Sequence, residues 1–298
     1  MGAAGHIMIE LPTATLEGIL ILATKRASLW ECKNPATPQH SKVIISVSIL
    51  IGLMAGYLAF QSVDLTIFLS ASHTLLTGQS PYSISEFVYP VSMALLIAPF
   101  SLLPPQLVFR AVMVASVNLY AFVILRATRS LPIAILAILS PLFLYNFFYA
   151  SLDWLVFAAL LVGPIPAFLL AMLKPQIGIG IAIIALLKVR RPVAVLLILA
   201  EATIFLASLA LGMHLNVATE HPGNMCIFPN GLIAGIPLMF LAVQRRDPLM
   251  ALAAAPLCSP YVGPQSWIAI LPFLVHQAHT RYRLRTRRET PKIPSRVH

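Results

Sequence analysis

The chain has 298 residues, of which 59% are hydrophobic and only 10% are Asp, Glu, Lys or Arg. Soluble domains carry roughly 25% charged residues, so this composition, with a mean hydropathy of +0.87, excludes soluble domains, a disordered chain and a disulfide-framed secreted domain. The net charge of +10 does not indicate a nucleic-acid partner, because its placement follows predicted membrane boundaries. We therefore predict an all-α, polytopic transmembrane helical bundle.

Residues 1–42 are predicted to form a cytoplasmic or interfacial segment ahead of the membrane domain. The apolar stretch 7–23 contains Glu10 and Glu17, and no basic stretch precedes it, which argues against a cleavable signal peptide. A membrane span would have to bury both glutamates, so an interfacial helix or a poorly ordered leader is favoured.

A single transmembrane domain is predicted over residues 43–278, with about 8–10 spans, some of them short or re-entrant. The 24 prolines predict that several helices begin at proline or are broken by it. The candidate spans are 43–61, 88–103, 106–125, 131–149, 152–172, 175–187, 192–213, 231–243, 248–257 and 266–276.

Lysine and arginine predict the orientation of the bundle. They are absent from three connecting segments, 62–89, 216–229 and 261–265. They cluster in four others, 25–42, 188–191, 245–246 and the tail 279–298. By the positive-inside rule we expect an integral protein of the plasma (inner) membrane, with both termini in the cytoplasm.

Arg126 and Arg129 leave two topologies open. If every middle segment crosses the membrane, both arginines lie outside. If 88–103 is re-entrant, they lie inside, and 152–172 must then double back at its Gly-Pro-Ile-Pro sequence. The same choice decides on which side of the membrane Asp153 lies.

The outer loop 62–89 is the richest polar segment. It opens with Asp64, and apolar residues recur at helical spacing from Leu65 to Leu76, which predicts a helix lying on the membrane surface. Gly78 is expected to end this helix, and residues 79–82 to turn the chain. Asp64 is either a marker of the membrane interface or a general base that accepts a proton from a hydroxyl.

Lys174 precedes Pro175, which can occupy the first position of a helix. Both topologies place Lys174 on the outer side. Its ammonium and the helix N-terminus could together form a phosphate site, or the side chain could extend to the outer headgroups.

Other polar groups allow simpler interpretations. Asp153 is expected to cap the helix that begins at the interfacial Trp154. Glu201, near the middle of a span, requires a polar partner or protonation. Cys226 and Cys258 fall on outer loops, where they could form a disulfide or remain two free thiols.

Several motifs appear in an order that resembles glycosyltransferase family 87, within the GT-C superfamily. The first group is Asp64, a surface helix, Leu75-Leu76-Thr77-Gly78-Gln79-Ser80-Pro81-Tyr82, Phe87-Val88-Tyr89-Pro90 and Ala98-Pro99-Phe100-Ser101-Leu102-Leu103-Pro104. Later pieces are Leu173-Lys174-Pro175-Gln176 and Cys258-Ser259-Pro260-Tyr261. The chain looks like a shortened member, with Ser151-Leu152-Asp153 where many members carry a Gly-Gln pair.

The resemblance implies transfer of a monosaccharide from a polyprenyl-phosphate donor to an acceptor at the outer face of the membrane. It implies that Asp64 is the catalytic base. Substrate is expected to bind Lys174, Gln176, Tyr82, Tyr89 and His73. The donor's lipid lies in the membrane, and the acceptor is not specified.

No cofactor and no metal site are predicted, because the three cysteines lack CxxC spacing and paired histidines. A metal-independent hexosyltransferase is the first hypothesis. The alternatives are a non-catalytic scaffold or lipid-binding subunit that keeps the fold, and a transporter built from proline-broken helices.

Overall fold

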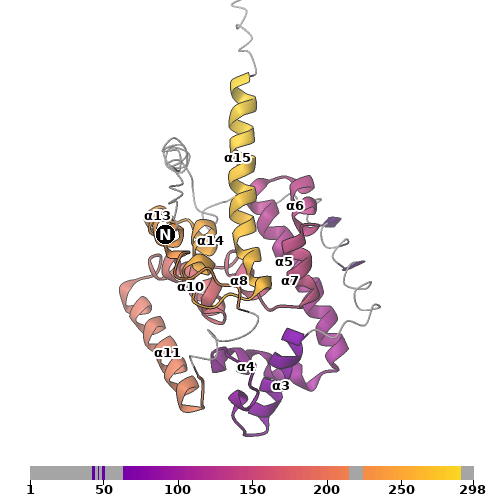
Figure 1. Ribbon diagram of the computed structural model, residues 1–298, viewed down its shortest axis with the longest axis vertical. Helices are drawn as coiled ribbons and strands as arrows, with labels where there is room; N and C mark the ends of the chain where they lie inside the picture. The colour runs from indigo at the N-terminus through magenta and orange to yellow at the C-terminus, as the bar shows by residue number, and fades with distance from the viewer. Residues whose placement is uncertain (1–41, 44–45, 47–48, 51–62, 215–223, 290–298) are drawn as a thin grey trace, which may run out of the picture.

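The computed structural model describes residues 42–43, 46, 49–50, 63–214 and 224–289, with side chains up to residue 282. Within these ranges every regular element is a helix, so the all-α prediction is confirmed for this part of the chain. Most of the first predicted span, 43–61, lies outside the described residues, as does the interfacial segment before it. Figure 1 shows the helices gathered around a common core, with α15 projecting beyond them.

Two helices are long and apolar enough to cross a membrane, α5 (Pro105–Thr128) and α11 (Arg191–Ala210). The predicted span 131–149 is a pair, α6 (Leu131–Ile138) and α7 (Pro141–Phe148), bent by 56° at the Ser140-Pro141 step. Proline at position 141 starts a new helix because it lacks the N–H that would continue the old one. These elements are compatible with a helical membrane protein.

The remaining predicted spans are shorter helices that pack on one another. They are α8 (Trp154–Ala159), α9 (Pro164–Met172), α10 (Pro175–Leu186), α13 (Leu232–Arg245) and α14 (Pro248–Cys258). Helix α10 lies against both α9 and α14. Gly178 and Gly180 allow this close approach, because a Cβ on either would overlap the backbone of Ala171 or Ala251.

The outer loop contains the predicted surface helix, α3 (Val63–Leu76). Gly78, with φ of +79°, follows its last turn, and η2 (Pro81–Ser83) turns the chain toward α4 (Val91–Ile97) and η3 (Ala98–Leu102). The apolar segment Val91–Leu102 would extend only about 18 Å as a continuous helix, well short of the roughly 30 Å bilayer core. This segment belongs with the other short apolar helices of the described part of the chain, such as α10 and α14.

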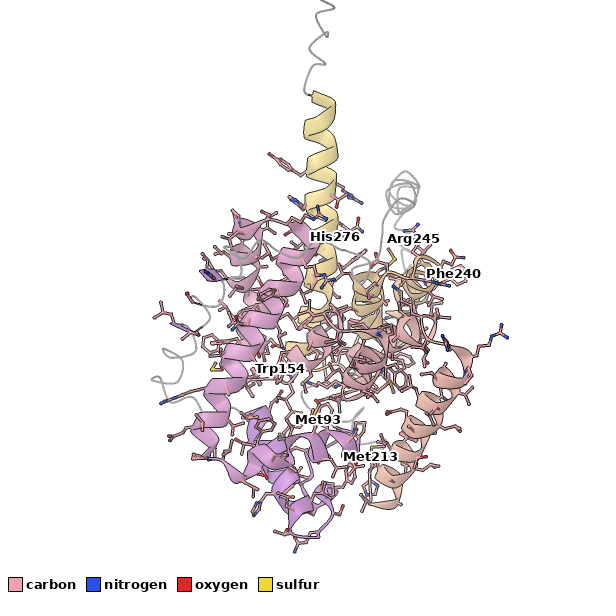
Figure 2. All side chains as sticks on the ribbon, turned by 180° about the vertical axis from the view of Figure 1, so that it is seen from behind. Met93, Trp154, Met213, Phe240, Arg245 and His276 are labelled. Atoms are coloured by element: carbon pink, nitrogen blue, oxygen red, sulfur yellow. The ribbon has the colours of Figure 1, made fainter. Side chains whose placement is uncertain are left out.

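The two ends of the molecule differ in charge. One end, here called the basic end, holds the C-terminus of α5 and the α10–α11 and α13–α14 connections, where Arg126, Lys188 and Arg246 line one pocket. The opposite end, here called the loop end, holds α3 and α4 (Figure 1). Arg245 and His276 lie toward the basic end in Figure 2, and Met93 and Met213 toward the loop end.

The shared pocket matches one of the two topologies that the sequence leaves open, the one in which 88–103 is re-entrant. Arg126 shares a pocket with Lys188, so it lies on the same side of the molecule as that basic cluster. The turn 161–164 between α8 and α9 lines the same pocket, so 152–172 doubles back as predicted for this alternative. Asp153 consequently lies away from the basic end.

After the turn η4 (Pro264–Ile270), α15 (Leu271–Glu289) packs along α5 and then projects from the basic end. His276 Nδ1 lies 2.7 Å from the Ala127 carbonyl oxygen, which fixes the two helices beside each other. The helix continues beyond residue 278, where the sequence predicted the start of the tail.

Candidate functional site

A buried ion pair lies at the centre of the bundle. Lys174 Nζ is 2.5 Å from Asp153 Oδ1, and both side chains have zero exposure. Asp153 stands just before α8 and Lys174 just before α10. Helices α8 and α9 therefore separate them along the chain, while the fold returns them to one point. A buried charge is retained in such surroundings only when it is paired and hydrogen-bonded.

Neutral polar groups complete the surroundings of this pair. Lys174 Nζ donates to Ser151 Oγ at 3.0 Å. Asn146 Nδ2 donates to Asp153 Oδ2 at 2.7 Å, and Ser266 Oγ donates to Oδ1 at 3.4 Å. Both carboxylate oxygens therefore have protein donors, and the lysine has two oxygen acceptors.

The network extends from this pair to Asp64. Asn146 Nδ2 also donates to the backbone carbonyl of Gln265 at 3.1 Å. The side-chain amide of Gln265 in turn donates to Asp64 Oδ2 at 2.8 Å. Asp64 lies in the first turn of α3 and is partly exposed. One continuous chain of polar groups thus joins a carboxylate at the molecular surface to the buried Lys174.

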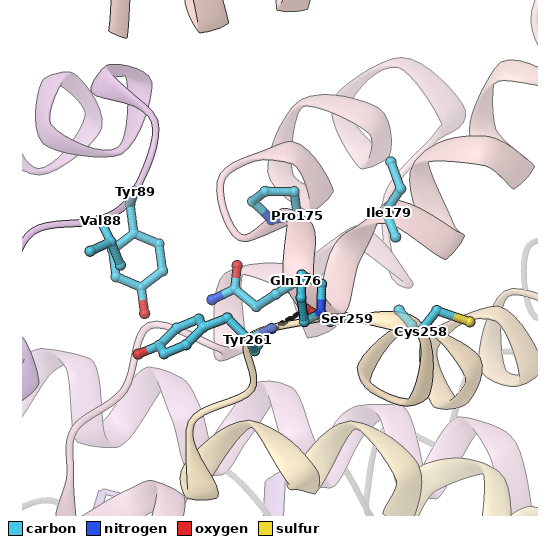
Figure 3. Close-up of a pocket in the computed structure, with 10 residues that line it drawn as sticks. Val88, Tyr89, Pro175, Gln176, Ile179, Cys258, Ser259 and Tyr261 are labelled. Atoms are coloured by element: carbon cyan, nitrogen blue, oxygen red, sulfur yellow. Dashed lines mark hydrogen bonds between the residues drawn. The ribbon is translucent and has the colours of Figure 1, made fainter. Parts of the chain in front are cut away.

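A pocket of about 340 Å³ opens beside this network. It lies between the segment before α4, the start of α10 and the loop after α14, and Figure 3 shows Tyr89, Gln176 and Tyr261 around the same space. Ser259 Oγ accepts the backbone N–H of Tyr261 at 3.2 Å, which holds that loop (the dashed line in Figure 3). Hydroxyl and amide groups therefore meet apolar walls that include Val88 and Ile179.

Tyr89 stands between the pocket and the buried pair. Its ring lines the pocket, and the ring centroid lies 5.2 Å from Lys174 Nζ. The Phe68 ring lies 6.0 Å from the same ammonium. Attraction between a cation and an aromatic ring adds to the stabilisation of Lys174. The ammonium is consequently enclosed by Asp153, Ser151 and two rings rather than directed into the pocket.

The charges of the cluster alter the ionisation of its members. Burial alone would lower the pKa of Lys174, but Asp153, Tyr89 and Asp64 together hold that pKa above its ordinary value. Burial raises the pKa of Tyr89 and of Tyr261, and the nearby positive charge of Lys174 only partly offsets this. At neutral pH the pocket therefore presents two neutral tyrosine hydroxyls beside a protonated lysine.

The residues predicted to bind substrate do not all meet at one place. Lys174, Gln176 and Tyr89 belong to the network or the pocket. Tyr82 supports them indirectly, since its hydroxyl donates to the Tyr89 carbonyl oxygen at 2.9 Å. His73 is exposed near the far end of α3, about 13 Å along the helix from Asp64, and belongs to neither the network nor the pocket.

Two interpretations of single residues are corrected, and two polar partners are added. Asp153 makes no side-chain cap for α8, because its carboxylate is committed to Lys174. Lys174 is fully buried, so it does not extend to the outer headgroups. Gln265 and Asn146 were not singled out in the sequence, although a lysine inside an apolar segment signals that polar partners must exist.

The sequence left two points open, whether Cys226 and Cys258 pair and what surrounds Glu201. Cys226 and Cys258 are free thiols rather than a disulfide. Glu201 lies on α11, the apolar helix that has only 11% of its spanning window buried. Within the described ranges, no group of three or more His, Cys, Asp or Glu side chains could hold a metal ion.

Comparison with known proteins finds no family model, curated protein or solved structure that matches this chain.

Proposed function

We propose that the protein is a membrane glycosyltransferase that transfers a monosaccharide from a polyprenyl-phosphate donor to an acceptor hydroxyl at the loop end. The observation that carries this proposal is the hydrogen bond from Gln265 to Asp64, which fixes a partly exposed carboxylate. That carboxylate interacts electrostatically with Tyr89 and Tyr261, two residues that line the pocket. The resemblance of the loop-end motifs to glycosyltransferase family 87 supports the same reaction. Hydroxyl and amide groups in the pocket suit a sugar, and its apolar walls suit the start of a lipid chain.

Asp64 is the proposed general base. Its carboxylate would accept the proton of the acceptor hydroxyl while that oxygen attacks the anomeric carbon of the donor. The bond between the anomeric carbon and the phosphate oxygen then breaks, and the electron pair leaves with the lipid phosphate. Gln265 orients Asp64 by donating to Oδ2.

The leaving phosphate would be placed near the start of α10. Pro175 and Gln176 line the pocket in the first turn of this 12-residue helix, whose N-terminal dipole favours a negative group. Lys174 would not contact the phosphate directly, since Tyr89 stands between its ammonium and the pocket. Its proposed part is to fix the start of α10 through Asp153 and to supply positive potential.

Transfer of radiolabelled sugar from polyprenyl-phosphate donors, in membranes containing the full chain, tests this proposal. Asp64→Asn should abolish transfer, because the amide cannot accept the proton. Glu86→Gln is the matched control, since Glu86 is an exposed acid in the same loop and outside the pocket. Transfer that persists in Asp64→Asn would remove Asp64 from the mechanism.

A non-catalytic membrane subunit is the second candidate, favoured by one observation. Every charged atom of the Lys174–Asp153 pair already has a protein partner, as in a purely structural ion pair. Absence of transfer by the parent protein over a panel of polyprenyl-phosphate sugars and acceptors would favour this candidate.

A further inference from the structure

A second pocket, of about 510 Å³, opens at the basic end. Three cationic side chains line it, and each comes from a different part of the chain. Arg126 lies near the end of α5, Lys188 follows α10, and Arg246 follows α13. The tertiary fold brings these three side chains together, because no two of them are close in the sequence.

The lining of this pocket contains no acidic residue. The carboxylate nearest in sequence is Asp247, and its Oδ1 accepts the backbone N–H groups of Leu249 at 2.9 Å and Met250 at 3.2 Å. It therefore caps the start of α14 and is not among the residues that face the pocket. All the formally charged side chains among the residues that line the pocket are therefore cationic.

Two backbone positions in the wall of this pocket are unusual. Arg246 adopts a left-handed conformation, with φ of +51°, at the end of α13. Glycine or asparagine usually occupies that position, whereas here the residue brings a guanidinium to the pocket wall. Gly163 also lines the pocket, and a Cβ added to it would meet no atom within 4 Å.

The other walls are apolar, formed by Leu161, Val162, Pro164 and Leu187. A site that combines several cations with apolar walls between transmembrane helices suits an anionic headgroup whose chains continue along the protein. Arginine and lysine both bind phosphate oxygens through charge-assisted hydrogen bonds.

We propose that this pocket binds a phosphate group, carried either by an anionic membrane lipid or by a soluble phosphate, and that the apolar walls favour the lipid. The site is separate from the loop-end pocket. The 12 residues of α10 lie between the two, a separation of about 18 Å along the helix. The proposal is independent of the glycosyltransferase reaction.

The test uses the full chain, delipidated in neutral detergent, with native mass spectrometry of added lipids. Phosphatidylglycerol should bind more tightly than phosphatidylcholine with the same acyl chains. The double variant Lys188→Gln/Arg246→Gln should weaken phosphatidylglycerol binding by about 30-fold, since each basic residue near a lipid surface contributes roughly fivefold. Arg190→Gln/Arg191→Gln is the matched control, because it removes the same charge from two exposed residues outside the pocket.

Gly163→Leu separates shape from charge. Its side chain would enter the open space beside Gly163 and block the pocket while all three cations remain. It should therefore weaken phosphatidylglycerol binding with no change in net charge. Its thermal unfolding temperature, compared with that of the parent, checks that the fold is intact.

Inorganic phosphate distinguishes the two sources. Binding of phosphate alone, with displacement of the lipid, would assign the site to a soluble phosphate. Tight lipid binding that excess phosphate does not displace would assign it to a membrane lipid. The proposal is overturned if neither probe binds in preference to phosphatidylcholine, or if the Arg190/Arg191 control loses as much binding as the pocket variant.

Discussion

The Lys174–Asp153 pair permits a quantitative prediction about stability. Both side chains are wholly buried and lie 2.5 Å apart, so removal of either one leaves an opposite charge without its main partner. Such a loss costs about 3–5 kcal/mol of unfolding free energy in a protein interior. We expect a destabilisation of that size in Lys174→Met and in Asp153→Asn.

The double variant Lys174→Met/Asp153→Asn should be less destabilised than the sum of the two single variants. It contains no buried charge, and Asn146 can still hydrogen-bond to the new amide. A coupling free energy of roughly 2–3 kcal/mol is expected for residues in one network. Reversible unfolding in mixed micelles, followed by tryptophan fluorescence, to which the adjacent Trp154 contributes, measures all four proteins in one cycle.

The pH dependence of the pair has a definite sign. Because nearby negative groups hold the pKa of Lys174 above its ordinary value, the pair should stabilise the fold fully below about pH 10.4, the usual lysine value. The stabilisation should be lost only as the pH rises further, through the raised pKa of the folded state. Additive single variants, or single variants within about 0.5 kcal/mol of the parent, would refute the account of a coupled buried pair.

Three other predictions concern single positions. Gly178→Ala should lower the unfolding free energy by about 1–3 kcal/mol, because its methyl group would overlap the Ala171 backbone; an unchanged unfolding midpoint would contradict this packing. Asp247→Ala should lower the unfolding free energy by about 1 kcal/mol, because α14 loses its cap. Asp247→Ser should keep most of the stability that the cap contributes, and the same unfolding experiment measures both variants. Burial raises the pKa of Tyr261, so Tyr261→Phe should remove less of the tyrosinate absorbance gained at pH 10 than the loss of a tyrosine with an ordinary pKa would; a loss as large as that of an ordinary tyrosine would contradict the burial of this hydroxyl.

Much of the fold follows from local sequence signals. The helix beginning at Asp64 and the spans 106–125 and 192–213 correspond to α3, α5 and α11 within a few residues. Each is a continuous apolar or periodic stretch that ends near Gly or begins near Pro. Hydrophobicity alone, however, could not decide whether 88–103 crosses the membrane, because an apolar segment gains from burial in protein as well as in lipid. In the structure Arg126 and Lys188 line one pocket, which is the arrangement expected if 88–103 is re-entrant.

The site was less accessible to sequence analysis. Asp64 and Lys174 stand out because charge is rare in this chain, and the structure joins them through one network. The partner of Lys174, however, lies 21 residues away. The two residues are brought together by the doubling back of 152–172, which the sequence predicted for only one of its two alternative topologies. Gln265 is 201 residues from Asp64, and no local pattern distinguishes a glutamine that bonds a carboxylate from one that faces solvent.

The two pockets share a single wall element, and this has a mechanical consequence. Helix α10 forms part of the loop-end pocket with Pro175 and Gln176, and its C-terminal end leads into Leu187 and Lys188 of the basic pocket. Its glycines leave no clearance against α9 and α14, so α10 can shift only together with those two helices. If a ligand in one pocket shifts this group of helices and thereby alters the affinity of the other pocket, a ligand in the second pocket must alter the affinity of the first by the same factor.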